Sequence, residues 1–345
     1  MIQLYGQFDG YYSHAQVSRG ILQGLCENGV NDLVVHNLGT GGFAEAGDFS
    51  YQCARSVFAD VSLYIGGYPP FSIAYMGAHR FRAALFICES EVVPREWGSI
   101  ADKFDLLCFP SEWTRQAYIK AGAPAERSIV VHHGLHPVFE KRITHGDYMG
   151  QSLFVHVAGA ASFLDRKGTP QLVEAFKRVF GASRAARLLL RCAATPQTER
   201  FLVDGLIDLH EPDNSWGALE PEKMRQLYMQ ADCVIQPSRA EAFGMVPMEA
   251  RAMGLPVMLT DSSGHLEHFE GASDVCIPTG PSAPISVNGI PSGMAPTVKV
   301  EDIEDALRDW PKNTLCSKFD STYYERWCWG NVTKELARAL KDADA

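Results

Sequence analysis

Short apolar runs alternate with longer segments of helical period along most of the chain. The runs are apolar on successive residues, which is typical of parallel strands covered on both faces. Within Thr169–Phe180 the apolar residues instead recur every three or four positions and predict one face of a helix. This alternation predicts α/β architecture with doubly wound parallel sheets. The predicted strands are Ile2–Tyr5, Leu33–His36, Val61–Ile65, Ala84–Cys88, Leu106–Phe109, Ile129–His132, Leu153–Ala158, Leu188–Cys192, Cys233–Gln236 and Pro256–Thr260.

The predicted strands form two series, separated by the polar stretch Lys141–Gln151. We therefore expect a first domain over residues 1–148 and a second over residues 149–318. The length of 345 residues agrees with this division, because a domain commonly takes about 150 residues.

Two further segments stand out after the second strand series. The Pro-, Gly- and Ser-rich stretch Pro278–Pro296 predicts a long loop. The segment Tyr323–Leu340 predicts a last helix, in which Trp327 and Trp329 stand on an otherwise charged pattern. We expect these tryptophans to serve packing rather than chemistry.

The charge balance of the chain disfavours some classes of binding partner. The chain has 41 acidic and 31 basic residues, a net charge of −10. A protein wrapped in nucleic acid or held on an anionic membrane needs a basic surface, so both classes are disfavoured. A local basic groove stays compatible with this composition.

The nine cysteines indicate a reducing compartment. No two have C-x-x-C spacing, and several stand in apolar runs such as Phe86-Ile87-Cys88. We therefore expect free thiols, a cytoplasmic location and no zinc site. The segment Met1–Tyr5 reads as a first strand and not as a signal peptide. No apolar run approaches the roughly 18 residues that would span a bilayer, so we expect no integral membrane association.

The segment Pro237–Ala250 carries the most chemical information. It follows an apolar strand and opens a predicted helix. Gly244 lets the backbone approach a ligand, and free amides at a helix start bind anions. Glu241 and Glu249 add two carboxylates, so the segment suits a ligand with both diphosphate and hydroxyl groups, such as a nucleotide sugar. The alternative, a solvated loop acid and a surface helix residue, stays open on these residues alone.

The same segment resembles a known signature. Glu241 to Glu249, followed by Gly254-Leu255-Pro256-Val257, is similar to the E-x-F-G-x4-E-A-x-A-x-G-x-P-V pattern of the retaining glycosyltransferases of family 4. Further segments resemble that family in the same order along the chain: Glu89–Trp97, Phe109–Thr114, Val130–Pro137 and Arg166-Lys167-Gly168.

The resemblance implies the GT-B fold, in which two Rossmann-like domains face each other across a cleft. It places the nucleotide-sugar donor mainly on the C-terminal domain and the acceptor on the N-terminal one. It also implies that a final helix, about residues 319–343, crosses back to the N-terminal domain.

Residue roles follow from the same resemblance. Glu249 is expected to bind the ribose hydroxyls, and Glu241 the hydroxyls of the donor sugar. Lys167 is expected to stabilise the diphosphate leaving group, as a metal does in other enzymes. Gly10 is expected in a glycine loop that closes over the reacting centre. The remaining expected donor-binding positions are Arg166, Ala242, Phe243, Gly244, Met245 and Val246.

The sequence also departs from the family. The arginine that usually stands five residues before the lysine is replaced by Ser162, and either Arg166 or Arg191 is expected to supply its charge. The family's acceptor-side histidine is absent, and Glu89 occupies that region. A carboxylate there would orient or deprotonate an acceptor hydroxyl, although a purely structural role for Glu89 is an equal alternative.

Two histidines have the spacing of metal ligands, but we do not expect them to bind a metal. His265 and His268 stand near Glu267, but the family places this stretch in a loop near the cleft. A D-x-D motif occurs only as Asp342-Ala343-Asp344. We therefore expect no metal and no cofactor.

The resemblance as a whole predicts a retaining transferase that uses a UDP- or GDP-linked sugar. A catalytically silent nucleotide-sugar-binding or assembly protein is one alternative, and a nucleotide-sugar hydrolase or epimerase is another. Glycan, lipid, small-molecule, protein and modified nucleic-acid acceptors all remain compatible, and the sequence leaves the oligomeric state open.

Overall fold

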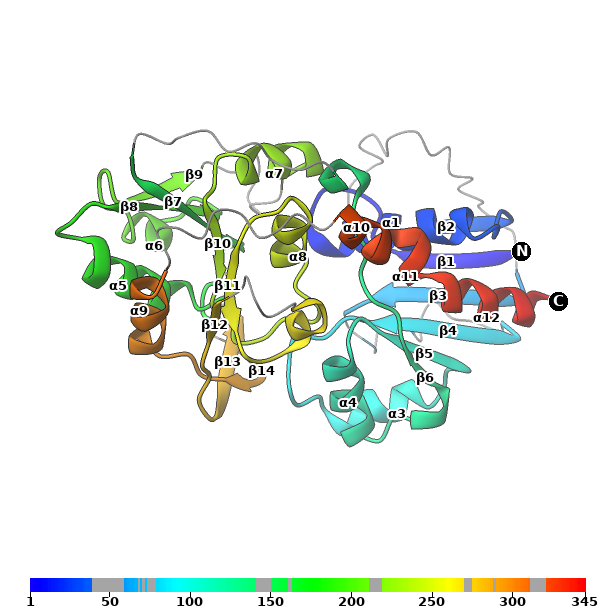
Figure 1. Ribbon diagram of the computed structural model, residues 1–345. Helices are drawn as coiled ribbons and strands as arrows, with labels where there is room; N and C mark the ends of the chain where they lie inside the picture. Colours follow the sequence, from blue (N-terminus) through cyan, green and yellow to red (C-terminus); the bar gives the residue numbers. More distant parts are fainter. Residues whose placement is uncertain are drawn as a thin grey trace. The chain divides into compact units, whose positions relative to one another are not determined.

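The computed structural model describes residues 1–38, 59–67, 69, 72, 79–140, 150–160, 163–210, 219–269, 275–287, 290–310 and 321–345. These residues form two compact units (Figure 1), one of Met1–His136 with Glu325–Ala345 and one of Pro137–Tyr324. The divisions differ from the expected domain limits at residues 148 and 318. The short helix Pro137–Glu140 packs against helices of the second unit, which accounts for the earlier first division.

The first unit contains a six-stranded parallel sheet with the order β2-β1-β3-β4-β5-β6. Its central strands are buried along most of their length, which accounts for their unbroken apolar runs. The strands are β1 Ile2–Gly6, β2 Leu33–Asn37, β3 Val61–Gly66, β4 Phe81–Phe86, β5 Leu106–Phe109 and β6 Ser128–Val130. The helices between them are α1 Ser13–Glu27, α3 Arg95–Ala101 and α4 Glu112–Lys120.

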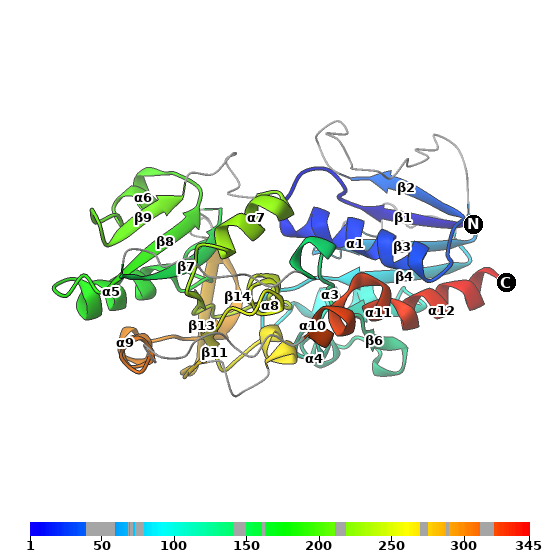
Figure 2. The ribbon, with the colours of Figure 1, turned by 45° about the horizontal axis from the view of Figure 1, so that its top comes forward.

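The C-terminal end of the chain returns to this first unit, as the predicted crossing helix implied. The prediction of one continuous helix over Tyr323–Leu340 is wrong, because the segment forms α10 Ser321–Trp327, α11 Trp329–Val332 and α12 Lys334–Asp344. Cys328 has an extended backbone (φ −66, ψ 153), which interrupts the helical hydrogen bonds. Figures 1 and 2 show α11 and α12 beside α1, and contacts join α1 to both helices.

Trp329 is the centre of this attachment, which confirms its expected packing role. Its side chain is buried against glycines of α1 and of the loop after β6. A Cβ added at Gly20 would lie 1.9 Å from the indole ring, and one at Gly134 would lie 2.6 Å from it. The indole therefore packs directly on backbone, which only glycine permits at these positions.

The second unit contains another six-stranded parallel sheet, with the order β12-β11-β10-β7-β8-β9. Chain order reverses between β7 and β10, and open α/β sheets bind ligands beyond the carboxyl ends of the strands at such a point. The strands are β7 Ser152–Gly159, β8 Ala186–Cys192, β9 Ile207–His210, β10 Cys233–Gln236, β11 Val257–Thr260 and β12 Val275–Ile277. The main helices are α5 Thr169–Phe180, α7 Pro221–Tyr228, α8 Met245–Ala252 and α9 Val300–Arg308.

The expected long loop over Pro278–Pro296 is a second wrong prediction. Most of it forms an antiparallel hairpin of β13 Ser282–Val287 and β14 Ile290–Pro296. Arg239, which is 5% exposed, donates to the carbonyl oxygens of Ala283, Pro284, Ala295 and Pro296. These long-range hydrogen bonds hold a strand pair whose Pro- and Gly-rich sequence has weak strand propensity of its own.

No helix within the described ranges is both long enough and apolar enough to cross a membrane.

Candidate functional site

The candidate site is built from the loops that follow β7 and β10, on either side of the point where strand order reverses. The two loops are joined through their backbones, because the Arg239 amide donates to the Arg166 carbonyl over 2.8 Å. Gly168 has a φ of 67° and lies against the Pro237 carbonyl, where an added Cβ would approach to 2.1 Å. Glycine is therefore required at this crossing of the loops.

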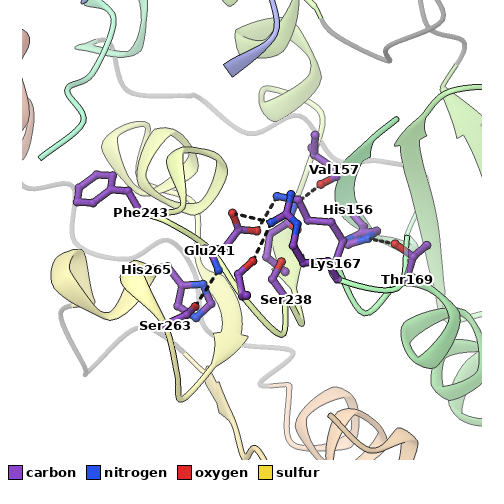
Figure 3. A network of polar contacts seen from close by, with 12 residues as sticks. His156, Val157, Lys167, Thr169, Ser238, Glu241, Phe243, Ser263 and His265 are labelled. Carbon is purple, nitrogen blue, oxygen red and sulfur yellow. Dashed lines mark hydrogen bonds and ion pairs between the residues drawn. The ribbon is translucent and has the colours of Figure 1, made fainter. Parts of the chain in front are cut away.

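Lys167 and Glu241 meet across these loops. Lys167 Nζ donates to Glu241 Oε1 over 2.6 Å, and Figure 3 shows the two side chains pointing toward each other. Arg166 Nη1 lies 3.6 Å from the other oxygen of the same carboxylate. The structure thus brings together three residues that the sequence analysis placed at one diphosphate and sugar site.

The neighbouring positive charges affect the pKa of Glu241 more strongly than its burial does. Burial alone would raise its pKa, but the opposite charges of Lys167 and Arg166 lower the pKa to about 2. Glu241 is therefore an anion at neutral pH although it is 7% exposed. The alternative of a solvated loop acid is wrong for this residue.

The backbone around Glu241 is also fixed. Its amide donates to Ser263 Oγ over 3.2 Å, and its carbonyl accepts from the Gly264 amide over 2.9 Å. Arg166 Nη1 donates to the Ala240 carbonyl over 2.7 Å. The carboxylate is thus held from both its side chain and its main chain, which favours a precise contact with a ligand.

Arg166 is the arginine beside the Lys167–Glu241 pair. Arg191, the other candidate, is fully buried in β8 and donates to the His210 carbonyl over 3.2 Å. Ser162 lies outside the described residues.

The expected anion-binding turn lies at the start of α8. Gly244 has a φ of 87° and precedes Met245, the first residue of the helix. The first amides of a helix have no intrahelical acceptor, and the helix dipole favours negative charge there. The predicted positions before and after this turn, Ala242, Phe243 and Val246, lie in the same loop and first turn.

Glu249 lies in α8 and is 6% exposed. Its carboxyl group accepts a hydrogen bond of 2.8 Å from the Tyr228 hydroxyl of α7. Burial raises the pKa of Glu249 to about 8, and the hydrogen bond from Tyr228 only partly opposes this effect. The alternative of a surface helix residue is therefore wrong, and the group is largely protonated near neutral pH.

Two predicted site residues lie in the first unit. Gly10 follows β1 with a φ of 76°, and Arg19 donates to the carbonyls of Phe8 and Gly10 over 2.6 and 2.7 Å. Glu89 is half-buried in the loop after β4. The structure places both at the carboxyl ends of strands, which is where this sheet class carries functional groups.

Several residues that shape the site were missed from the sequence. Tyr228 positions the Glu249 carboxyl group, Ser263 accepts from the Glu241 amide, and Arg239 also pairs with Asp165 over 3.1 Å. These contacts join residues far apart in sequence, so no local spacing reveals them. The one available signal was a charged residue, Arg239, three positions after the buried strand β10.

The paired histidines have structural partners. His265 Nε2 lies 2.7 Å from the Thr260 carbonyl, and His268 Nε2 lies 3.1 Å from the Phe243 carbonyl. Burial lowers the pKa of His268 to about 3. No group of three or more His, Cys, Asp or Glu suited to a metal ion is found in the part of the chain that the structure describes.

Sequence comparisons point to one enzyme class. Residues 152–285, which include every described residue of the Lys167–Glu241 site and Glu249, match the family described as "Glycosyl transferases group 1". An uncharacterised glycosyltransferase of Methanocaldococcus jannaschii is 28% identical over 37% of this chain and 30% of its own length. A lipopolysaccharide 1,2-N-acetylglucosaminetransferase of Salmonella typhimurium is 25% identical over 51% of this chain and 45% of its own length. The matched segments thus span less than half of these curated relatives.

Solved structures match the whole chain. Anabaena HepE, solved with UDP and glucose, gives a TM-score of 0.67 at 14% identity and covers 99% of both chains. WaaG, a glycosyltransferase involved in lipopolysaccharide biosynthesis, gives 0.59 at 14% identity over 100% of this chain and 98% of its own. At such identities the likeness shows the fold alone. It confirms the predicted GT-B class with two Rossmann-like domains.

Proposed function

We propose that this protein is a retaining glycosyltransferase that transfers a sugar from a nucleotide diphosphate to an acceptor hydroxyl or comparable nucleophile. The observation that carries the proposal is the 2.6 Å pair of Lys167 with an anionic, buried Glu241 beside the first turn of α8. This arrangement offers positive charge and amides to a diphosphate, and a carboxylate to sugar hydroxyls. The group 1 glycosyltransferase match over the same residues supports it.

The proposed donor is a UDP-sugar, with a GDP-sugar as the second candidate. HepE was solved with UDP and with UDP-glucose, which supports the uridine nucleotide. Glu249 is assigned to the ribose hydroxyls. Because its carboxyl group is buried and held by Tyr228, it can accept and donate hydrogen bonds when protonated.

In the proposed reaction, the bond between the anomeric carbon and the β-phosphate oxygen breaks while the acceptor oxygen bonds to the same carbon on the same face. The acceptor proton passes to the departing phosphate, so the products are the glycoside and a nucleoside diphosphate. An ammonium group carries three donors, and Glu241 uses one from Lys167. The others are available to the charge that develops on the leaving group.

Positive charge from Lys167 and Arg166 supports metal-independent transfer, because it can serve the role that a metal ion serves in other phosphate chemistry. Glu89 and Gly10 are assigned to the acceptor side, where Glu89 would orient the attacking hydroxyl. The cysteines in the described ranges are all free thiols, which supports the proposed cytoplasmic location.

The test is incubation with UDP- and GDP-linked sugars and a panel of glycan, lipid, small-molecule, protein and nucleic-acid acceptors. Mass spectrometry detects the transferred sugar, and NMR of the anomeric proton compares the donor and product configurations. Retained configuration is the expected result, and an inverted product would contradict the mechanism. Free sugar without a glycoside would favour a hydrolase, a changed nucleotide sugar an epimerase, and binding without turnover a silent binding protein.

A further inference from the structure

His268 packs against the turn that precedes α8. The side chain is 1% exposed, and its ring centroid lies 5.1 Å from that of Phe243. Its Nε2 lies 3.1 Å from the Phe243 carbonyl oxygen. Because a carbonyl oxygen only accepts, Nε2 must carry the hydrogen of this bond. Burial, followed by the nearby charge of Arg251, lowers the pKa of His268 to about 3, so the ring is a neutral donor.

This hydrogen bond sets the orientation of one peptide group. The chain contains no cis peptide bond in its described residues, so the Phe243 carbonyl and the Gly244 amide point in opposite directions. With His268 on the carbonyl side, the Gly244 N–H must point away from His268. The described residues provide no hydrogen-bond acceptor for this N–H.

The turn has little freedom to move toward His268. A Cβ at Gly244 would lie 2.5 Å from His265 Cβ and 3.4 Å from His268 Nε2. Gly244 itself has a φ of 87°, which leaves the turn dependent on its neighbours for its conformation. The turn therefore packs against His265 and His268, and His268 donates a hydrogen bond to the carbonyl of its Phe243–Gly244 peptide.

We infer that His268 is a positioning residue that aims the Gly244 amide at the diphosphate of the nucleotide ligand. This inference rests on the proposed function, because the diphosphate is the group that the first turn of α8 would bind. His268 touches no part of the ligand in this assignment. It acts through the Phe243–Gly244 peptide and so affects affinity for the phosphates without affecting affinity for the nucleoside.

Two substitutions at His268, with side chains of equal length, separate the effect of its hydrogen bond from the effect of its packing. H268Q keeps an N–H donor near the position of Nε2, whereas H268M fills similar space without a donor. Dissociation constants for UDP and uridine, and for GDP and guanosine, are measured by calorimetry on the full chain. We expect H268M to weaken diphosphate binding about tenfold, the usual scale of one hydrogen bond to a charged partner. Nucleoside binding should stay unchanged, and H268Q should restore diphosphate affinity to within about threefold.

The matched control is H79Q, at a buried histidine of the first unit whose Nδ1 lies 2.6 Å from the Ala59 carbonyl oxygen. Its ratio of diphosphate to nucleoside affinity should equal that of the unsubstituted protein, and thermal melting checks that each variant folds. Equal losses of diphosphate and nucleoside affinity in H268M, or no recovery in H268Q, would overturn the inference. If the unsubstituted protein binds no nucleoside diphosphate at all, the proposed function fails as well.

A second measurement needs no variant. In spectra of the unsubstituted protein with ¹⁵N-labelled glycine, the assigned Gly244 amide proton should move downfield when UDP or GDP is added. It should not move with the nucleoside. An unmoved Gly244 signal at saturating diphosphate would contradict the inference even where H268M fails to fold.

Discussion

Two buried glutamates, eight positions apart, have pKa values that are shifted in opposite directions by their surroundings. Glu241 faces two cations, and its pKa falls to about 2, whereas Glu249 faces a tyrosine hydroxyl, and its pKa rises to about 8. The same residue type thus presents an anion at one point of the site and a largely neutral carboxyl group at the other. In the proposed function, the anionic Glu241 holds the cations that would face the diphosphate, and the largely neutral Glu249 would bind the ribose hydroxyls.

The first residue-scale prediction concerns the Lys167–Glu241 pair. E241Q should lower the free energy of unfolding by about 2 to 4 kcal/mol, because it leaves buried cations without their counter-charge. K167M in the same chain should recover part of that loss, which a double-mutant cycle by chemical denaturation measures. E241Q should also slow sugar transfer by about 100-fold, a typical effect of losing one charged contact to a reacting group. Strictly additive stability effects would show that the contact carries no coupling.

The second residue-scale prediction concerns pH. The pKa of Glu249 is higher in the folded chain than its ordinary value of 4.5, so the folded state binds the proton more tightly. Its contribution to stability is complete below about pH 4.5 and is lost as pH rises to about 8. Relative to E249Q, the unsubstituted protein should therefore lose about 4 kcal/mol of stability across this window. Denaturation curves of both proteins at several pH values measure the difference, and parallel pH profiles would refute the raised pKa.

Elements in this protein are positioned as much by single anchoring side chains as by their own sequence. Trp329 attaches the C-terminal helices to glycine-lined backbone in the first unit, and Arg239 holds the β13–β14 hairpin through carbonyl oxygens. Apolar runs therefore predicted the central strands and α5, because burial on both faces leaves a local pattern. The hairpin and the breaks in the last helix depend on distant partners, and the sequence pattern contained no local sign of them.

The element-scale prediction tests the attachment at Trp329. W329A should lower the stability of the first unit by about 3 to 4 kcal/mol, because it removes a buried indole and leaves a cavity between backbone segments. Hydrogen exchange followed by mass spectrometry should show the loss in peptides from α1 and β1. The matched control is W310A, since Trp310 packs against Phe154 in the second unit. W310A should instead increase hydrogen exchange in β7. Equal increases in both units for both variants would contradict the assignment of each tryptophan to the stability of one unit.

For the whole molecule, sequence reasoning identified the class of fold and most of the residues that meet at the candidate site. Lys167 and Glu241 lie 74 positions apart along the chain. Their shared site was predicted by the resemblance to family 4 glycosyltransferases, because the strand-helix pattern alone indicated the fold class and not which loops meet. Sequence reasoning could not find the supporting contacts of Tyr228, Ser263 and His268, because those depend on which loops meet in space.

The diphosphate site at Lys167 and Glu241 is tested most directly by nucleotide binding to the unsubstituted chain and to K167M, measured by titration calorimetry with UDP, GDP and their nucleosides. We expect one of the two diphosphates to bind saturably and K167M to weaken that binding about tenfold or more, with nucleoside affinity unchanged. Equal diphosphate affinity in both proteins, or no nucleotide binding by the unsubstituted protein, would contradict this expectation.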